Sequence, residues 1–372
     1  YFLWLVPPHA RADYPAGEWG AVIAVLGTVT LFTGTLQGLR QEQSKRLLAF
    51  SSIGQAGYIM LGLGVCLTLL NSREPAAMAL AAAAFCGALA HTWYHGIFKS
   101  LLFLNAGAVL HATGTQDINK LGGLMRWMPV TAVTALIASF SIAGVPLFSG
   151  FVSKWSIYVA AVQAGPLARG LPVCAMVAIL TSALTLALFI KFFGGMFLAR
   201  PSSLVEHAAG RRPLEGSWKM RVSQLVLAAA CVLFGLFPVL PMTLIQEALL
   251  ASRQGLGIVI AEANPVNLGW MAGVGAASQQ SIYAPLGIAV VLVLMFLAAR
   301  GLARLGGARR RATVPWLCGY AVASEANRYP AGGFYGELKR YLQRVPGWAP
   351  APAPSSAEAK PKEAIAWSLE KN

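Results

Sequence analysis

The stretch HTWYHGIFKSLLFL, residues 91–104, places two histidines and a lysine inside a long apolar segment. Charged side chains in the middle of a bilayer cost roughly 2.5–3.5 kcal/mol each on insertion scales, so an apolar segment that keeps them indicates a functional site. His91, His95 and Lys99 are spaced i, i+4 and i+8, and a helix therefore places all three along one side. We expect this side to face the interior of a helix bundle or a water-filled cavity.

The composition of the whole chain is that of a membrane protein. Of its 372 residues, 56% are hydrophobic and only 12% are charged, whereas a soluble domain carries about 25% charged residues. Several apolar runs reach about 20 residues, the length that a helix needs to cross a bilayer. So many runs disfavour the alternative of a soluble protein with unusually apolar helices. The sequence therefore predicts an all-α, polytopic membrane protein.

About seven membrane spans are predicted, one of them broken. They lie at residues 19–40, 46–70, 77–111, 128–165, 172–198, 222–247 and 283–304. The fourth run is too long for one straight helix and contains AGVPLFSG, residues 143–150. Pro146 has no N–H to donate, and the two glycines loosen the backbone on either side. We therefore expect one half-helix to end near residue 143 and the other to begin near residue 150.

The net charge of +15 is concentrated in alternate connections between the predicted spans. These basic connections are residues 40–46, 116–126, 200–221 and 300–311. The positive-inside rule places them in the cytoplasm together with the C-terminus. We expect the membrane to be the inner membrane of a prokaryotic cell. A basic surface against the lipid bilayer accounts for the charge, so we expect no binding of nucleic acid.

The cysteines predict no cofactor or metal site. They are Cys66, Cys86, Cys174, Cys231 and Cys318. They are scattered and form no CxxC pair, which favours neither a disulfide framework nor an iron–sulfur or other metal centre. The sequence also contains no phosphate loop and no nucleotide-binding fingerprint.

Both ends of the chain lie outside the predicted spans. Residues 1–18 open at Tyr1 in an apolar piece too short to span, which we interpret as the end of a truncated helix and an outer loop. This start predicts a fragment of a longer polypeptide. Residues 313–372 are predicted to form a cytoplasmic C-terminal segment, and their Pro- and Ala-rich tail is predicted to be disordered.

Two interpretations of the 91–99 row remain open. In the first, His91, His95 and Lys99 relay protons, because histidine titrates near neutral pH and a row of titratable groups gives a proton successive positions. In the second, Lys99 extends towards the cytoplasm while the histidines only make hydrogen bonds between helices. The spacing favours the relay.

Three further polar residues are candidates. Lys154 follows the predicted helix break, where it is either a gate or exit site or an ordinary interfacial lysine. Lys191 is a possible accessory site, with the alternative that it extends to the cytoplasmic surface. Tyr58 is a second accessory candidate, because it could line a channel together with Gln55.

Three segments resemble the core of a known family, the antiporter-like subunits of respiratory complex I, membrane-bound nickel–iron hydrogenases and Mrp-type sodium/proton antiporters. They are KRLLAFSSIGQAGY (45–58), HTWYHGIFKSLLFLNAGAVLHATGTQDINKLGGL (91–124) and MPVTAVTALIASFSIAGVPLFSGFVSKW (128–155). VPWLCGY (314–320) more loosely resembles the hydrogenase-type branch, that of hydrogenase-4 component B and formate hydrogenlyase subunit 3.

The resemblance implies a fold of two inverted five-helix repeats, with residues 19–200 as the second repeat and residues 201–312 as additional helices and loops. It places Lys99 at the central lysine of that repeat, with the two histidines as its relay and Lys154 beside the exit. The first repeat, with its glutamate and lysine pair, would lie upstream of Tyr1. Gln43 stands where family members often have an acidic residue, and we expect this difference to affect a surface contact rather than conduction.

The resemblance therefore predicts a proton-translocating subunit of a respiratory oxidoreductase complex that contains no redox centre of its own. Its expected partners are other membrane subunits and a peripheral electron-transfer arm. One alternative is a stand-alone Mrp-type antiporter subunit that moves sodium as well as protons. Another is a structural membrane anchor, which the buried row disfavours because an anchor gains nothing from the cost of inserting it.

Overall fold

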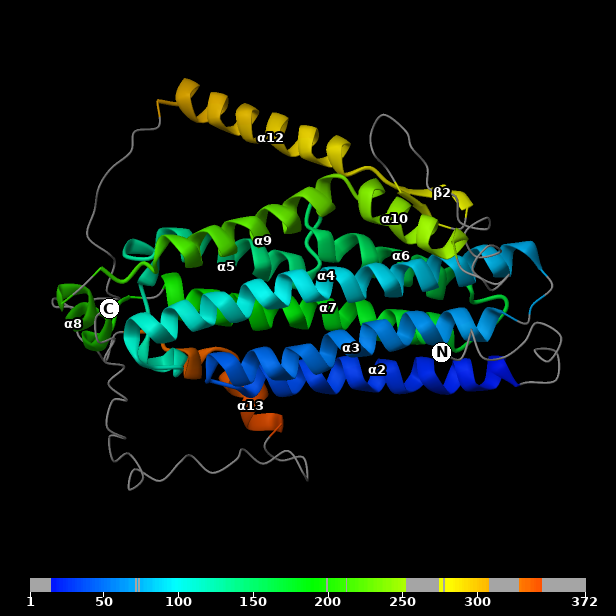
Figure 1. The fold of residues 1–372 in the computed structure, drawn as a ribbon, viewed down its shortest axis with the longest axis horizontal. Coiled ribbons are helices and arrows are strands. Elements are labelled where there is room, and N and C mark those ends of the chain that lie inside the picture. Colours follow the sequence, from blue (N-terminus) through cyan, green and yellow to red (C-terminus); the bar gives the residue numbers. More distant parts are fainter. Residues whose placement is uncertain are drawn as a thin grey trace, which may run out of the picture. The chain divides into compact units, whose positions relative to one another are not determined.

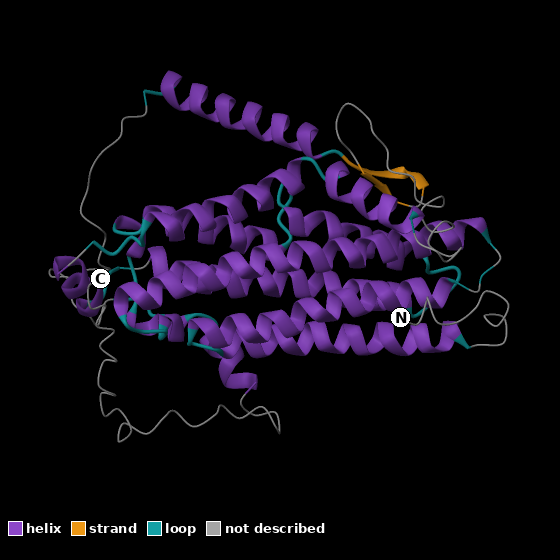
Figure 2. Cartoon of the chain, viewed as in Figure 1, coloured by secondary structure: helices purple, strands orange, loops and turns teal. Residues whose placement is uncertain are grey.

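The computed structural model describes residues 15–70, 72, 74–198, 200–211, 213–251, 274–276, 278–307 and 328–342, and helices dominate them (Figures 1 and 2). Among these residues, six helices are long and apolar enough to cross a membrane. Shorter apolar helices accompany them. The predicted helical membrane fold is confirmed.

The first three helices match three predicted spans closely. They are α2 (Ala16–Arg40), α3 (Ser44–Leu69) and α4 (Pro75–Thr113). The proline at the first position of α4 and the left-handed Gly114 after its last residue are the usual signals for a helix start and stop. With its 39 residues α4 is about 58 Å long at 1.5 Å per residue, and it carries the whole row from His91 to Lys99.

The predicted break in the fourth span is confirmed. Helix α5 covers Pro129–Ala143 and α6 covers Ser149–Gln163. At the end of α5, the N–H of Gly144 bonds the carbonyl of Ser141 and the N–H of Val145 bonds that of Phe140, which is the Schellman pattern. Gly144 adopts the left-handed conformation that this pattern needs, with a φ of 77°.

The sixth predicted span, 222–247, is wrong as a single helix. The structure divides this region into α9 (Trp218–Leu236) and α10 (Val239–Leu250). Pro238 lies between them and has no N–H with which to continue the hydrogen-bond ladder of α9. The fifth and seventh spans agree with α7 (Leu171–Phe193), which continues as a π-helical turn over Gly194–Leu198, and with α12 (Pro285–Leu305).

Some smaller elements lie in segments that the sequence only indicates as loops. Helix α8 covers Ser203–Arg211, and the antiparallel strands β1 (Val274–Ala276) and β2 (Ser278–Tyr283) form a hairpin before α12. Single 3₁₀ turns cover Ile118–Lys120, Leu124–Arg126 and Ala331–Gly333. Helix α13 (Gly336–Leu342) belongs to a separate unit that begins at Tyr335, and it carries an ion pair of 2.7 Å between Arg340 and Glu337.

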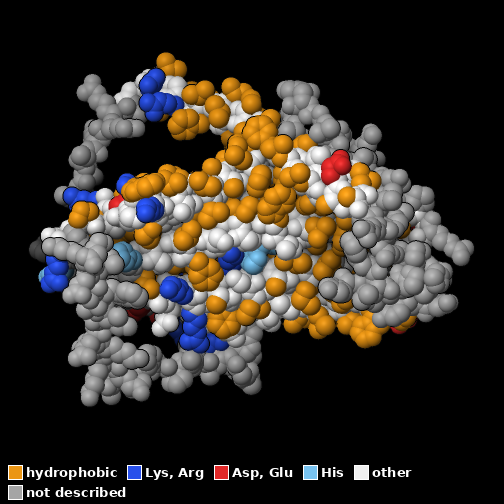
Figure 3. All heavy atoms as spheres, in the orientation of Figure 1, with side chains coloured by type: hydrophobic (Ala, Val, Ile, Leu, Met, Phe, Trp, Pro, Cys, Tyr) orange, Lys and Arg blue, Asp and Glu red, His pale blue; other side chains and the backbone are white. Residues whose placement is uncertain are grey.

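Three of the basic connections meet at one end of the bundle. The N–H of Ser44 donates to the carbonyl of Gln116 at 2.8 Å, and the N–H of Ile118 donates to that of Glu42 at 2.9 Å. The hydroxyl of Ser202 donates to the carbonyl of Lys120 at 2.7 Å. Figure 3 shows most of the visible Lys and Arg side chains toward one end of the view, with mainly apolar and uncharged side chains over the middle. We call this the basic end.

Candidate functional site

The row on α4 faces a second polar row on α3. Ser51, Gln55 and Tyr58 are spaced i, i+4 and i+7, so they share one side of α3. Because the two helices are antiparallel in this region, Ser51 lies beside Lys99 while Gln55 lies beside His91. The sequence analysis named Gln55 and Tyr58 but missed Ser51, although the spacing within SSIGQAGY carries the signal.

Lys99 is held inside the bundle. Its side chain is 5% exposed, and its Nζ donates to the carbonyl of Leu48 at 2.8 Å and to the hydroxyl of Ser51 at 2.6 Å. The alternative in which Lys99 extends to the aqueous surface is therefore wrong. A buried ammonium group must find acceptors inside the protein, and α3 provides them.

His91 connects three helices. Its Nδ1 lies 2.8 Å from the hydroxyl of Ser153 on α6, and its Nε2 lies 3.1 Å from the Oε1 of Gln55 on α3. The ring of His95 stacks on the ring of His91 with 6.5 Å between their centroids. Nε2 of His95 is buried and has no hydrogen-bond partner among the described residues. The histidines therefore make contacts between helices and also leave one ring nitrogen available for water.

Lys154 is buried at the helix break. Its side chain is 1% exposed, and its Nζ donates to the carbonyl of Ile142 at 2.9 Å and to the hydroxyl of Ser182 at 3.2 Å. The Ile142 carbonyl lies in the last turn of α5, and the residue four positions later is Pro146, which has no N–H to offer it. The interpretation of Lys154 as an ordinary interfacial lysine is therefore wrong.

Tyr58 links Lys154 to the histidines. The Nζ of Lys154 lies 4.4 Å from the centroid of the Tyr58 ring, within the range of a cation–π contact. The ring of His91 lies 5.8 Å from the same ring, between centroids. The Tyr58 hydroxyl donates to the carbonyl of Ala178 at 2.8 Å and lies 3.1 Å from the hydroxyl of Ser182.

Three further residues of this network were not among the candidate site residues of the sequence analysis. Ser153, Tyr158 and Ser182 come from α6 and α7, and the Tyr158 hydroxyl lies 2.6 Å from that of Ser182. Isolated serines in apolar helices carry no signal of their own, because many of them only bond the carbonyl one turn earlier. We call the whole set the relay row: Ser51, Gln55, Tyr58, His91, His95, Lys99, Ser153, Lys154, Tyr158 and Ser182.

Lys191 is buried beside the C-terminal end of α2. It is 0% exposed, so it does not extend to the aqueous surface. Its Nζ donates to the carbonyl of Leu39 at 2.5 Å and to that of Gln41 at 2.6 Å, at the end of α2. A lysine at a helix C-terminus satisfies unpaired carbonyls and opposes the helix dipole. These contacts favour a structural role for Lys191 over an accessory site.

The relay row has the chemistry of a proton path. It joins titratable lysines, histidines and tyrosines through hydroxyl groups, and histidine can accept a proton on one nitrogen and release one from the other. None of its members is a carboxylate. Among the described residues, no group of three or more His, Cys, Asp or Glu side chains could hold a metal ion.

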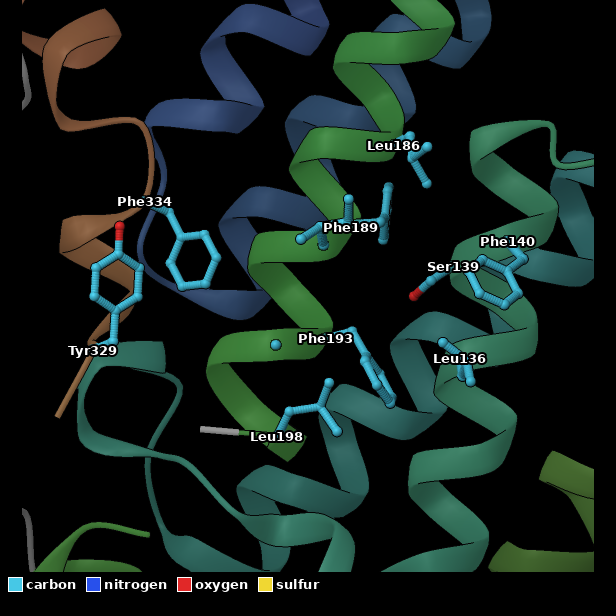
Figure 4. Close-up of a pocket in the computed structure, with 11 residues that line it drawn as sticks. Leu136, Ser139, Phe140, Leu186, Phe189, Phe193, Leu198, Tyr329 and Phe334 are labelled. Atoms are coloured by element: carbon cyan, nitrogen blue, oxygen red, sulfur yellow. The ribbon is translucent and has the colours of Figure 1, made fainter. Parts of the chain in front are cut away.

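A separate cavity of about 420 Å³ lies between α5, α7 and residues 329–334 (Figure 4). The close-up shows Leu136 and Phe140 from α5 opposite Leu186, Phe189 and Phe193 from α7. Its lining is mainly apolar and includes no member of the relay row. We therefore place the candidate site at the relay row rather than in this cavity.

The matching protein family covers the relay row. Residues 9–185 match the family described as NADH:quinone oxidoreductase/Mrp antiporter, transmembrane. Residues 9–185 therefore have the fold of an antiporter-like membrane subunit. The resemblance indicated by the three sequence segments is confirmed, and the match contains every member of the relay row.

Two relatives show the breadth of the antiporter-like group. The chain is 34% identical over 223 residues to hydrogenase-4 component B of Escherichia coli K12, covering 59% of this chain and 32% of that protein. It is 37% identical over 245 residues to Na(+)/H(+) antiporter subunit A1 of Staphylococcus saprophyticus, covering 63% of this chain and 30% of that protein. The antiporter-like chain thus spans about a third of the length of these relatives.

A solved structure supports the fold over a longer stretch. The match is to an archaeal respiratory membrane complex, the membrane-bound sulfane sulfur reductase, with a TM-score of 0.67 and 26% identity. It covers 87% of the antiporter-like chain and 48% of the matched chain. The similarity therefore extends beyond the family match into the later part of the chain.

Proposed function

We propose that this antiporter-like chain translocates protons as part of a membrane subunit of a respiratory oxidoreductase complex, either hydrogenase-type or NADH:quinone oxidoreductase. The observation that carries the proposal is the relay row, in which Lys99 and Lys154 are both buried. His95, which precedes Lys99 by one turn of α4, begins a series of ring contacts through His91 and Tyr58 to Lys154. Burying charged or titratable groups is costly, and a structural anchor gains nothing from it. A proton path requires such groups.

In this proposal, protons enter from the basic end, pass Lys99 and the histidines, and leave near Lys154. We propose that the chain itself carries no redox centre. Electron transfer in a peripheral arm and in neighbouring membrane subunits changes the conformation and charge around the relay row, and those changes move the protons. The basic end faces the cytoplasm of a prokaryotic cell, and the relay row lies within its inner membrane.

The test is proton flux through the native complex, purified with a tag on this chain and reconstituted in liposomes. Electron transfer drives the flux and is started by adding the electron donor, either NADH or hydrogen. A pH-sensitive dye trapped inside the liposomes reports the flux. We expect Lys99→Ala to abolish the proton flux while the complex still assembles. The ammonium group that donates hydrogen bonds to Leu48 and Ser51 is, in this proposal, also a group that binds and releases the translocated protons.

Lys219→Ala is the matched control, because Lys219 is an exposed lysine on α9 outside the relay row. It should conduct protons like the wild type. If the Lys99→Ala complex contains all its subunits and still conducts at the wild-type rate, the proposal is wrong.

A sodium/proton antiporter subunit is the second candidate, and the 37% identity to an Na(+)/H(+) antiporter subunit A1 supports it. Against it, the relay row offers no carboxylate, and hard cations such as sodium prefer oxygen ligands of that kind. The same liposomes decide between the two functions. Proton flux that requires sodium on the opposite side would favour the antiporter, and sodium-independent flux would favour the pump.

A further inference from the structure

Glu215 joins the basic end to the interior of the bundle. It lies in the connection between α8 and α9, and its carboxylate reaches the first turn of α5. There it accepts a hydrogen bond from the N–H of Val130 at 2.9 Å, from the N–H of Thr131 at 3.4 Å and from the hydroxyl of Thr131 at 2.6 Å. Glu215 is partly exposed, whereas Thr131 is fully buried.

A buried polar cluster continues from Thr131 into the bundle. The Thr131 hydroxyl lies 3.4 Å from Oε1 of Gln224 on α9. One turn further along α5, the Thr134 hydroxyl donates to Oδ1 of Asn105 on α4 at 3.1 Å. All four side chains are buried at the contact of α4, α5 and α9. We call them the amide cluster: Asn105, Thr131, Thr134 and Gln224.

Two polar atoms of the amide cluster point to a ligand. Nδ2 of Asn105 and Nε2 of Gln224 have no hydrogen-bond partner among the described residues. Leaving a buried donor without a partner costs about 1–3 kcal/mol, and ordered water normally removes this cost. Capping of the first turn of α5 would explain the hydrogen bonds between Glu215 and Thr131. It does not explain why two amide side chains are buried further inside the bundle.

We propose that Glu215 collects protons at the basic end and that the amide cluster and its ordered water deliver them towards Lys99. Asn105 follows Lys99 by six residues on α4, a rise of about 9 Å along the helix axis. This inference rests on the proposed function, and it names the residues that supply the relay row with protons.

The proton balance is simple. A proton from the aqueous phase adds to one carboxylate oxygen of Glu215, giving the neutral acid. The acid then releases a proton to a water molecule beside the amide cluster and returns to the carboxylate. Each further water molecule accepts one proton and releases one, so no oxidant or reductant is needed.

The experiment uses the reconstituted complex described above and compares initial proton flux. Glu215→Gln keeps an oxygen that can accept from the first turn of α5 but cannot carry a proton. We expect it to lower the flux about tenfold or more, in line with the loss of a positioned proton-transfer group. Glu215→Asp keeps the acid and should retain most of the flux. Glu206→Gln, an exposed glutamate on α8, should conduct like the wild type.

The Lys99→Ala and Thr131→Val variants distinguish a failure of this inference from a failure of the proposed function. If Glu215→Gln conducts at the wild-type rate while Lys99→Ala does not conduct, Glu215 is not the proton collector, but the proposed function stands. If Lys99→Ala also conducts normally, the proposed function itself fails. Should Glu215→Gln not assemble, Thr131→Val removes the hydroxyl and leaves the carboxylate in place. Reduced flux in that variant supports the route, and wild-type flux overturns it.

Discussion

At the scale of single residues, Gly144 determines where Lys154 can lie. It ends α5 in the left-handed conformation, with a φ of 77°. A Cβ atom at this position would lie 3.0 Å from Cδ of Lys154, closer than an ordinary van der Waals contact. The side chain of Lys154 therefore packs directly against the glycine on its way to the carbonyl of Ile142.

Gly144→Ala should destabilise the chain by about 1–2 kcal/mol, the cost of a left-handed residue that carries a Cβ. It should also lower proton flux, because the added methyl group displaces Lys154. Thermal unfolding of the purified complex in detergent and flux in liposomes measure the two effects. Gly107→Ala is the control, since Gly107 lies inside α4 and has no heavy atom within 4 Å of an added Cβ. Equal stability and equal proton flux in the two variants would contradict the inference that Gly144 determines where Lys154 lies.

The sequence predicts the titratable candidates of the relay row but not their hydrogen-bond partners. The spacing of His91, His95 and Lys99 alone places them on one side of a helix. The partners of Lys154 could not be predicted, because one is a backbone carbonyl left unpaired at a helix end and the other is Ser182 on a different helix. Periodicity describes a helix face, whereas these contacts depend on how separate helices pack.

At the scale of helices, close packing of α2 against α3 positions the α3 half of the relay row. A Cβ atom at Gly27 on α2 would lie 2.7 Å from the backbone nitrogen of Leu61 on α3. One at Gly57 on α3 would overlap the backbone of Leu31 on α2. Small residues let membrane helices approach at this distance, where van der Waals packing replaces the missing hydrophobic driving force. Gly57 directly precedes Tyr58, so this contact and the relay row share one segment.

Gly57→Ala should therefore force α2 and α3 apart. We expect a loss of about 1–3 kcal/mol in stability, the usual cost of overpacking, because the obstructing atoms belong to the backbone and cannot rotate away. Proton flux should fall as well, since the Tyr58 ring would move from Lys154. Unfolding of the complex by increasing concentrations of a denaturing detergent measures the stability. A variant as stable as the wild type would show that the two helices have room for a methyl group.

The two helix breaks show what an apolar sequence can and cannot reveal. The break between α5 and α6 was predicted because the apolar run was too long for one helix and contained glycine beside Pro146. The break at Pro238 was missed because the run 222–247 has the length of an ordinary span. Proline is tolerated within membrane helices when neighbours satisfy the freed carbonyls, so the sequence alone left both outcomes open. The hairpin before α12 gave no apolar signal at all.

At the scale of the whole molecule, the chain carries one relay row and spans about a third of its relatives' length, with 32% and 30% coverage of two of them. Three basic connections far apart in the sequence bond to one another through Ser44, Ile118 and Ser202. This arrangement explains the alternation of charge over these three connections, because each of them returns to the same end. The gathering of the connections could be predicted from the charge pattern, and the hydrogen bonds between them could not.

The orientation of the basic end is the last prediction, and labelling of single cysteines tests it. Lys120 lies at the basic end and Arg169 in the turn between α6 and α7, and both are exposed. The four cysteines among the described residues are buried and should react slowly, and Cys318→Ser removes the fifth. In intact cells, a membrane-impermeant maleimide should label Arg169→Cys and leave Lys120→Cys unlabelled until the membrane is permeabilised. The reverse pattern would place the basic end outside, and protons would then reach Lys154 before Lys99.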